Sequence, residues 1–269
     1  MAEKRIPIDP AELMRNYAAE RGDIFPEFHL IAEHRPLTVH LLQRAASYIL
    51  RDESRELSPV MRELIATCLL AARGEARFAA NHVRRLYRLG VTDTVILEAA
   101  EGMAPAFGHS AISHVAQAIL LAVDPGYPFG ELPEGGAPAA LTPFPEMELG
   151  DTAAPAPPSL ADDEDWRFAA GIDPELAARS AAFADHCLGA GAAGENILPP
   201  AARLLVTVAA LAVRGETGQA AALIRRGYRL GLNRRKVLEA ISCAQNMTGV
   251  ATTRVGIRAM RLAETASGE

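Results

Sequence analysis

The chain has 269 residues, of which 49% are hydrophobic and 5% aromatic, so it can bury a large core built mainly from small aliphatic side chains. Its formal net charge of −6 gives no overall attraction to nucleic acid or to an anionic membrane, and neither is expected as a partner. With no secretory signal, no apolar run long enough for a membrane span and three widely spaced cysteines, the sequence predicts a cytoplasmic protein in a reducing compartment.

Helix signals follow one another through the first half of the chain. Ser58-Pro59 is a typical helix start, a hydroxyl cap followed by proline at the first helical position. Apolar residues then keep helical spacing until Arg73-Gly74, and a second helix runs from Glu75 to Leu89 and stops at Gly90. So short a break predicts an antiparallel hairpin. The other helices expected here begin at Asp9-Pro10, span residues 36–51, run from Thr92 to about Met103 with Ala104-Pro105 as the end, and span residues 109–123.

Residues 125–164 are rich in proline, glycine and alanine, and we interpret them as a linker that wraps over the surface or is partly disordered. No segment of the chain predicts a β-strand, so the expected fold class is all-α. The features expected after the linker are a start near Trp166, a glycine-rich break over 189–194, a second hairpin over 200–230, a helix capped by Asn233 and a last helix over 250–263.

The chain contains two copies of one unit. A shift of 141 residues, without any gap, superimposes a set of residues that includes caps and helix breaks. This predicts two tandem domains that pack as a pseudo-dimer, residues 1–124 and 165–269, joined by the linker 125–164. The matched residues of the first copy are Leu57, Pro59, Arg62, Leu64, Arg73, Gly74, Glu75, Arg84, Arg85, Tyr87, Arg88, Leu89, Gly90, Leu97, Glu98, Ala99 and Gly108.

Glu63 and His82 lie on the two helices of the first hairpin, where antiparallel packing can bring them together. A carboxylate fixes the tautomer and orientation of an imidazole, which can then exchange a proton near neutral pH. The alternative is a partly buried pair that only ties two helices. In the second copy Leu204 and Leu223 replace both members. We therefore interpret the pair as the chemistry of the first copy, and the second copy as a structural partner that completes the pocket.

Arginines behave differently from this pair, because several are kept in both copies. Duplicated arginines on amphipathic helices are more often surface or interface ion pairs than anion sites, so we interpret them as structural. The matched arginines on these helices are Arg62, Arg84, Arg85 and Arg88, with Arg203, Arg225, Arg226 and Arg229 as their second copies.

Five short motifs carry a resemblance to a known family. The sequence resembles the carboxymuconolactone decarboxylase family, which includes alkyl hydroperoxidase D, over roughly 57–122 and more weakly over 199–262. The resemblance implies a small all-helical, alkyl hydroperoxidase D-like fold that oligomerises, a site in the hairpin near a subunit contact, and a proton relay made of Glu63 and His82. The motifs are Leu57-Ser58-Pro59, Arg62-Glu63-Leu64-Ile65, His82, Leu89-Gly90-Val91 and Ile96-Leu97-Glu98.

The same resemblance identifies candidate substrate-binding residues. In the peroxidase branch two cysteines precede the histidine by seven and four residues, where this chain has Glu75 and Phe78. Thiol peroxidase chemistry is therefore disfavoured and the decarboxylase-like branch is left. His109 follows the turn that closes the site in the family and is the third candidate. No metal is expected, because the histidine spacings do not place two imidazoles on one helical face.

These observations predict a cofactor-independent lyase of the decarboxylase type acting on a small carboxylic acid or lactone. The alternatives are an isomerase or hydrolase on the same scaffold, and a non-catalytic binding or assembly module. A homo-oligomer is expected, and three chains would provide six domains.

Overall fold

The protein is described by a computed structural model that covers residues 8–21, 24–149, 163–189 and 196–265. Within these ranges the chain forms helices and no β-strand, which confirms the all-α fold class. The elements are α1 Pro10–Arg21, α2 Pro26–His34, α3 Pro36–Arg51, α4 Pro59–Ala72, α5 Ala76–Arg88, α6 Asp93–Phe107, α7 His109–Val123, the short 3-10 helix η1 Pro145–Glu148, α8 Glu164–Ile172, α9 Pro174–Cys187, α10 Pro200–Arg214, α11 Thr217–Arg229, α12 Arg234–Thr248 and α13 Val250–Thr265.

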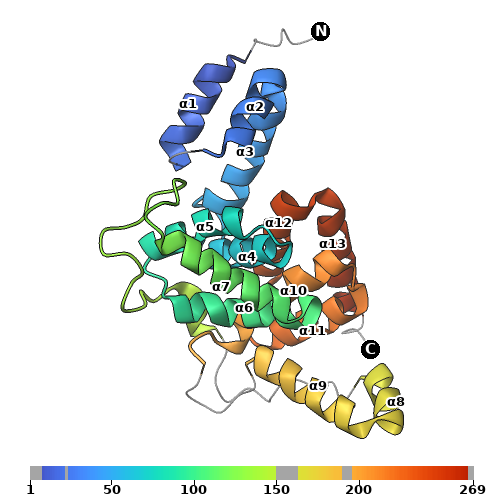
Figure 1. Ribbon diagram of the computed structural model, residues 1–269. Coiled ribbons are helices and arrows are strands. Elements are labelled where there is room, and N and C mark those ends of the chain that lie inside the picture. The colour runs from blue at the N-terminus through green and yellow to red at the C-terminus, as the bar shows by residue number, and fades with distance from the viewer. Residues whose placement is uncertain (1–7, 22–23, 150–162, 190–195, 266–269) are drawn as a thin grey trace, which may run out of the picture.

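Two groups of four helices, α4–α7 and α10–α13, form the centre of the molecule (Figure 1). Contacts between the groups come in corresponding sets, since α6 packs on α10 and α12 packs on α4. Helix α3, which precedes the first group, contacts α12 of the second group. Helix α9, which precedes the second group, contacts α6 of the first group. Figure 1 shows α1 and α2 at one end and α8 with α9 at the opposite end. The order and contacts of the helices therefore agree with the repeat seen in the sequence.

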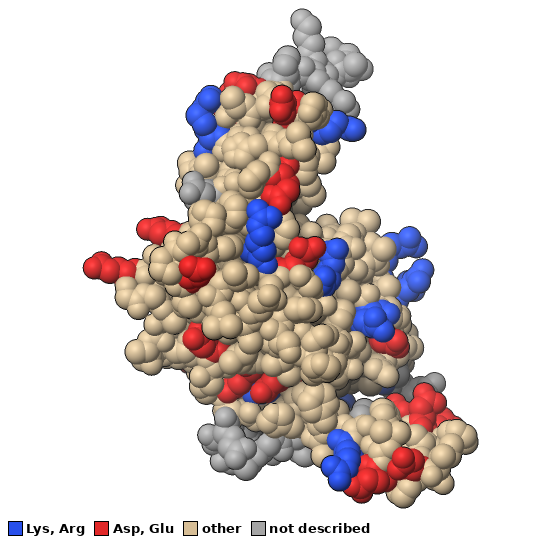
Figure 2. Space-filling view, in the orientation of Figure 1, with Lys and Arg blue, Asp and Glu red and all other residues tan. Residues whose placement is uncertain are grey.

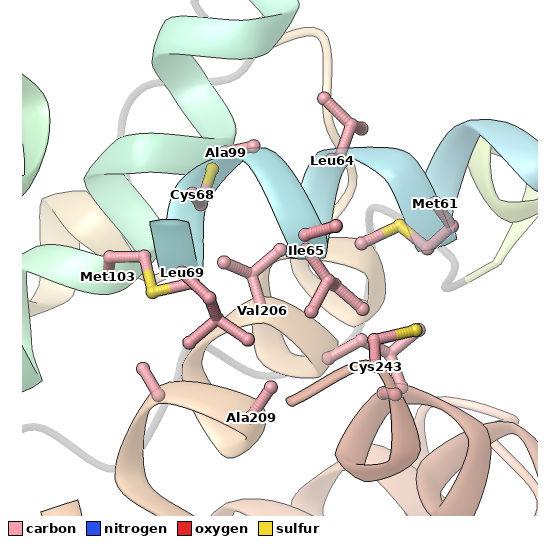
Figure 3. Packing of buried hydrophobic residues seen from close by; sticks show 14 of the residues in the cluster. Met61, Leu64, Ile65, Cys68, Leu69, Ala99, Met103, Val206, Ala209 and Cys243 are labelled. Carbon is pink, nitrogen blue, oxygen red and sulfur yellow. The ribbon is translucent and has the colours of Figure 1, made fainter. Parts of the chain in front are cut away.

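One hydrophobic core runs through both groups. Figure 3 shows side chains of α4, among them Ile65 and Leu69, on the side of the helix that faces Val206 and Ala209 of α10. All four of these side chains are buried, and Cys243 of α12 belongs to the same cluster. Because the apolar surface removed from water is shared between the groups, their association is part of the folding of the chain.

The groups are also joined by two equivalent hydrogen bonds, made by matched residues of the repeat. The backbone N–H of Leu198 donates to the Glu98 carboxylate at 2.7 Å, and the backbone N–H of Leu57 donates to the Glu239 carboxylate at 2.8 Å. Both carboxylates are buried. Since these residues are matched in the sequence repeat, each group holds the start of the other group's first helix.

The segment predicted as a linker, residues 125–164, is anchored in the protein at its start, where it follows α7. Arg84 of α5 is buried and donates to the carbonyls of Asp124, Tyr127, Phe129 and Gly130 at 2.8–3.2 Å. A buried guanidinium needs many acceptors, and the folded-back chain supplies them. The start of the predicted linker is therefore fixed to α5 by these hydrogen bonds. Residues 150–162, and most of the predicted break at 189–194, lie outside the described residues.

Glu146 of η1 gives this segment a second anchor. Its side chain is 0% exposed and accepts the backbone N–H of Ser58 at 3.0 Å, at the start of α4. The segment thus reaches the base of the first hairpin, a contact that its composition does not reveal.

Helix α6 differs from its predicted extent. It continues to Phe107 and contains Pro105, which had been expected to end it. Proline in the last turn removes a single backbone hydrogen bond, and the helix ends instead at Gly108, whose φ is +72°. Helices α2, α8 and α9 were not predicted individually. None of the described helices combines the length and the apolarity that a membrane crossing requires. On the face shown in Figure 2, acidic and basic side chains are interspersed.

Candidate active site

The first hairpin is set by its caps and its turn. Ser58 Oγ accepts the backbone N–H of Met61 at 3.1 Å, so α4 begins where the cap signal predicts. The turn before α5 passes through Gly74 with a φ of +84°, which glycine adopts at little cost. Helix α5 then returns along α4 and brings His82 to Glu63, with 2.6 Å between His82 Nδ1 and Glu63 Oε2.

Arg85 is a third member of this cluster. Its Nη1 lies 2.5 Å from Glu63 Oε1, and its side chain is 21% exposed. Arg85 and His82 are three residues apart on α5, so they share a helix face and both meet α4. Arg85 thus forms an ion pair across the contact between α4 and α5, in keeping with the predicted interface ion pairs, and it lies in the same cluster as His82. The sequence signal that could have found it is this spacing from His82.

Glu63 is a buried anion held by positive neighbours. Its side chain is 0% exposed, and burial by itself raises its pKa. The charges of His82, Arg85 and Arg51, together with the His82 hydrogen bond, outweigh burial and hold the pKa of this carboxyl below its ordinary 4.5. Glu63 is therefore ionised at neutral pH, and its Oε2 is an acceptor for a proton on Nδ1. The imidazole is thereby fixed with its other nitrogen, Nε2, available for a ligand.

A cavity of about 320 Å³ lies beside this cluster. Three predicted site residues of the first hairpin, Glu75, Phe78 and His82, line it. The His82 side chain is 18% exposed, whereas Glu63 lies behind it without exposure. His82 is thus the member of the pair that lines the cavity, and Glu63 is separated from it by the imidazole.

The remaining walls come from segments that the sequence did not assign to the site. Tyr17 of α1 and Phe28 of α2, with residues of α3, form one side. Asn246 and Met247, at the end of α12, form another side. The Nδ2 atom of Asn246 is buried, and no partner for it is found within the described ranges. Arg73 donates to the Met247 carbonyl and so holds the end of α12 at the cavity.

His109 lies away from these residues. It is exposed at the start of α7 and is not among the residues that line the cavity. The turn before it lies beside the second hairpin, where the Arg214 guanidinium sits 5.9 Å from the centre of the Phe107 ring. The end of α6 therefore lies against the second hairpin, and the end of α12 lies against the first hairpin. This exchange, which a residue pattern does not show, is why Asn246 and Met247 line the cavity and His109 does not.

The described part of the chain has buried thiols and no cluster of metal-ligand side chains. Cys68, Cys187 and Cys243 are free and buried, and burial raises the pKa of each thiol, to about 11 for Cys187 and about 12 for Cys243. Thiolates are the reactive form, so these thiols are poor nucleophiles. Among the described residues, no three His, Cys, Asp or Glu side chains are grouped as metal ligands.

Comparison with known proteins finds a family resemblance in the part of the chain that carries this hairpin. Residues 36–120 match the model of the carboxymuconolactone decarboxylase family. The matched segment contains Glu63 and His82, so the family resemblance predicted from the sequence is confirmed over this part of the chain.

A solved structure shares the fold along nearly the whole chain. It is the crystal structure of a protein from Burkholderia xenovorans LB400 that is named, provisionally, as a gamma-carboxymuconolactone decarboxylase subunit. The two chains are 17% identical with a TM-score of 0.56, and the match covers 97% of this chain and 98% of the other. At this identity the likeness shows the fold alone. No curated protein matches the sequence.

Proposed function

We propose that the protein is a lyase of the decarboxylase type that needs no cofactor and uses Glu63 and His82 as a proton relay on a small carboxylated or lactone-type substrate. The observation that best supports this is the 2.6 Å contact between Glu63 Oε2 and His82 Nδ1 at the wall of a cavity. The family match over residues 36–120 also supports a decarboxylase-like activity.

The relay suits the last step of a decarboxylation. The bond between a carbon and its carboxylate breaks, CO2 leaves, and the electron pair stays on the substrate, where a conjugated carbonyl takes it up. His82, protonated on both nitrogens, donates the Nε2 proton to that carbon. Glu63 accepts the Nδ1 hydrogen bond and stabilises the cationic imidazole until the proton has left. Water then returns a proton to His82, and Arg85 keeps Glu63 ionised throughout.

The same relay could serve other reactions. An isomerase would move a proton between two carbons of the substrate, and a hydrolase would use His82 to activate water. A binding or assembly module would need the cavity without the relay. Thiol peroxidase chemistry stays disfavoured, because Glu75 and Phe78 stand where the redox cysteines would be and the thiols of this chain are buried.

A deuterium experiment tests the proposal. Lactone acids and β-keto acids are incubated with the protein in D2O, and CO2 release is measured together with deuterium at the product carbon by NMR. We expect His82→Ala to lower both by about 10²–10⁴-fold, the usual contribution of a positioned acid or base. The matched control is Leu223→Ala, at the same position of the second hairpin, which should keep both signals.

The pH dependence adds a second readout. If His82 supplies the proton, the pH–rate profile should have a limb that vanishes in His82→Ala. Equal rates in His82→Ala and the wild type would contradict the relay, as would the absence of CO2 release from every acid tried. Deuterium exchange without CO2 release would favour the isomerase.

A further inference from the structure

The cavity beside His82 has a mainly apolar and aromatic lining. The rings of Phe25, Phe28 and Phe78 line it together with aliphatic residues of α3. Phe25 and Phe78 contact each other with 4.4 Å between their ring centres. Transfer of an apolar ligand from water to such a cavity is favourable. Transfer of a polar ligand is unfavourable, because the ligand loses its hydrogen bonds to water.

Charge is scarce in this cavity. Among its lining residues Arg73 is the cationic side chain apart from His82, and Glu75, also in the lining, carries the opposite charge. Arg73 already donates to the carbonyl of Met247. A ligand with two or three carboxylates needs about as many cationic partners when it leaves water, and the lining does not supply them.

The nearby Arg77 does not change this balance. Its guanidinium lies 4.8 Å from the centre of the Phe25 ring and 5.0 Å from that of Phe129. Its Nη1 also pairs with Glu27 at 2.6 Å. Arg77 therefore already pairs with Glu27 and stacks on aromatic rings, and it is not one of the residues that line the cavity.

The size of the cavity limits the ligand as well. Its volume of about 320 Å³ is roughly twice that of an apolar cavity of about 150 Å³ that holds benzene. A molecule with one ring and a short side chain fits this space. Flat rings also pack well against aromatic side chains.

We propose that the substrate is a ring-containing, predominantly apolar molecule with at most one carboxylate, and that its ring packs on Phe78 while its reacting carbon meets His82. This inference rests on the proposed function for the role of His82 and narrows its substrate from small acids in general to apolar aryl or alicyclic acids and their lactones. Phe78 determines this specificity, because it stands on the same face of α5 as His82, one helical turn away.

A binding experiment with the full chain tests the inference. Isothermal titration calorimetry compares 3-phenylpropanoate, which has one ring and one carboxylate, with hexanedioate, which has two carboxylates and no ring. We expect the ring acid to bind about tenfold or more tightly than the diacid. Equal or tighter binding of the diacid would overturn the inference, and so would no heat from the ring acid up to its solubility limit.

Variants of Phe78 make the test specific to this site. Phe78→Glu should weaken the ring acid by about tenfold or more, whereas Phe78→Leu, which keeps an apolar side chain, should retain most of the affinity. Gln219→Glu is the matched control, because Gln219 is exposed at the corresponding position of α11. A loss in Gln219→Glu as large as in Phe78→Glu would count against the inference.

His82→Ala separates this inference from the proposed function. If both are right, the variant binds 3-phenylpropanoate nearly as well as the wild type and has lost turnover. Turnover retained in His82→Ala, with the preference for the ring acid intact, would remove the relay and leave the substrate class standing. If the protein preferred the diacid and His82→Ala lost turnover, the proposed substrate class would be wrong and the relay would stand.

Discussion

The hairpins α4–α5 and α10–α11 share a glycine turn and several arginines but differ at the two positions that would carry chemistry. The first has Glu63 and His82 in contact at 2.6 Å. At the matched positions the second has Leu204, which is fully buried, and Leu223, which packs against the core. One hairpin thus holds a buried charged cluster beside a cavity, and its copy is filled with aliphatic side chains.

The arginine kept by both hairpins shows what this difference means. Arg226 occupies the position of Arg85 and is 4% exposed, and no partner for its Nη1 is found among the described residues. Burial lowers its pKa to about 10, the charge of Arg229 lowers it as well, and Asp185 raises it. The fold therefore keeps a buried arginine here even without the carboxylate. The arginine is thus retained in both copies, whereas Glu63 and His82 are replaced together in the second.

The largest effect is expected for a matched pair of arginines on the first helix of each hairpin. Arg203 is 0% exposed and contacts the carboxylates of Glu98 and Glu101, each at 3.0 Å, whereas Arg62 donates to backbone carbonyls. Arg203→Met should cost about 3–5 kcal/mol of unfolding free energy, because it removes the cationic partner of the buried Glu98 carboxylate. Arg62→Met should cost less. Urea denaturation followed by circular dichroism measures both, and the reverse order would break this account of the two halves.

A somewhat smaller effect is expected for Leu204→Ala. The substitution removes a fully buried side chain at the position of Glu63, and we expect a cost of about 2–5 kcal/mol. Its turnover per folded molecule should equal that of the wild type, because Leu204 is not among the residues that line the cavity. Thermal unfolding and CO2 release, measured on the same preparation, test this. A selective loss of turnover with unchanged stability would contradict the division between the hairpins.

Glu63→Leu, which copies the second hairpin into the first, should have a moderate effect on stability. Losing the hydrogen bond and ion pairs of a buried carboxylate should cost about 1–3 kcal/mol near pH 7. The folded state holds the pKa of Glu63 below 4.5, so its contribution is present above that pH and is lost as the pH falls below it. Denaturation curves of variant and wild type should therefore converge in acid. A constant difference down to low pH would show that ionisation of Glu63 does not stabilise the fold.

The smallest effect tests what the hairpins share. Gly74 and Gly215 both have a φ of +84°, and a Cβ at either position would meet no atom within 4 Å. Gly74→Ala and Gly215→Ala should each cost about 1–2 kcal/mol, since only backbone strain opposes them. Equal changes in the denaturation midpoint are expected, and clearly unequal changes would show that the two turns are not equivalent.

Local signals were enough to predict most of the helices. Ser58 and Asn233 cap the helices that follow them, and the side chain of Asn233 accepts the backbone N–H of Lys236 at 2.9 Å. Pro105 misled the prediction, because proline is an unreliable stop signal in the last turn of a helix. The anchoring of residues 124–149 by Arg84 could not be predicted, because its acceptors are backbone carbonyls that exist at any sequence.

The sequence by itself determined the helical hairpins, because caps, glycine breaks and apolar spacing act within one or two turns of chain. The shift of 141 residues also revealed the repeat and singled out Glu63 and His82, which are replaced together in the second copy. Only the tertiary structure decided which face of the pair opens to a cavity, that Arg85 joins it, and that α12 rather than the His109 turn walls the site. Those features depend on contacts between segments far apart in the chain, which are set by packing of the whole core and leave no periodic signal in the sequence.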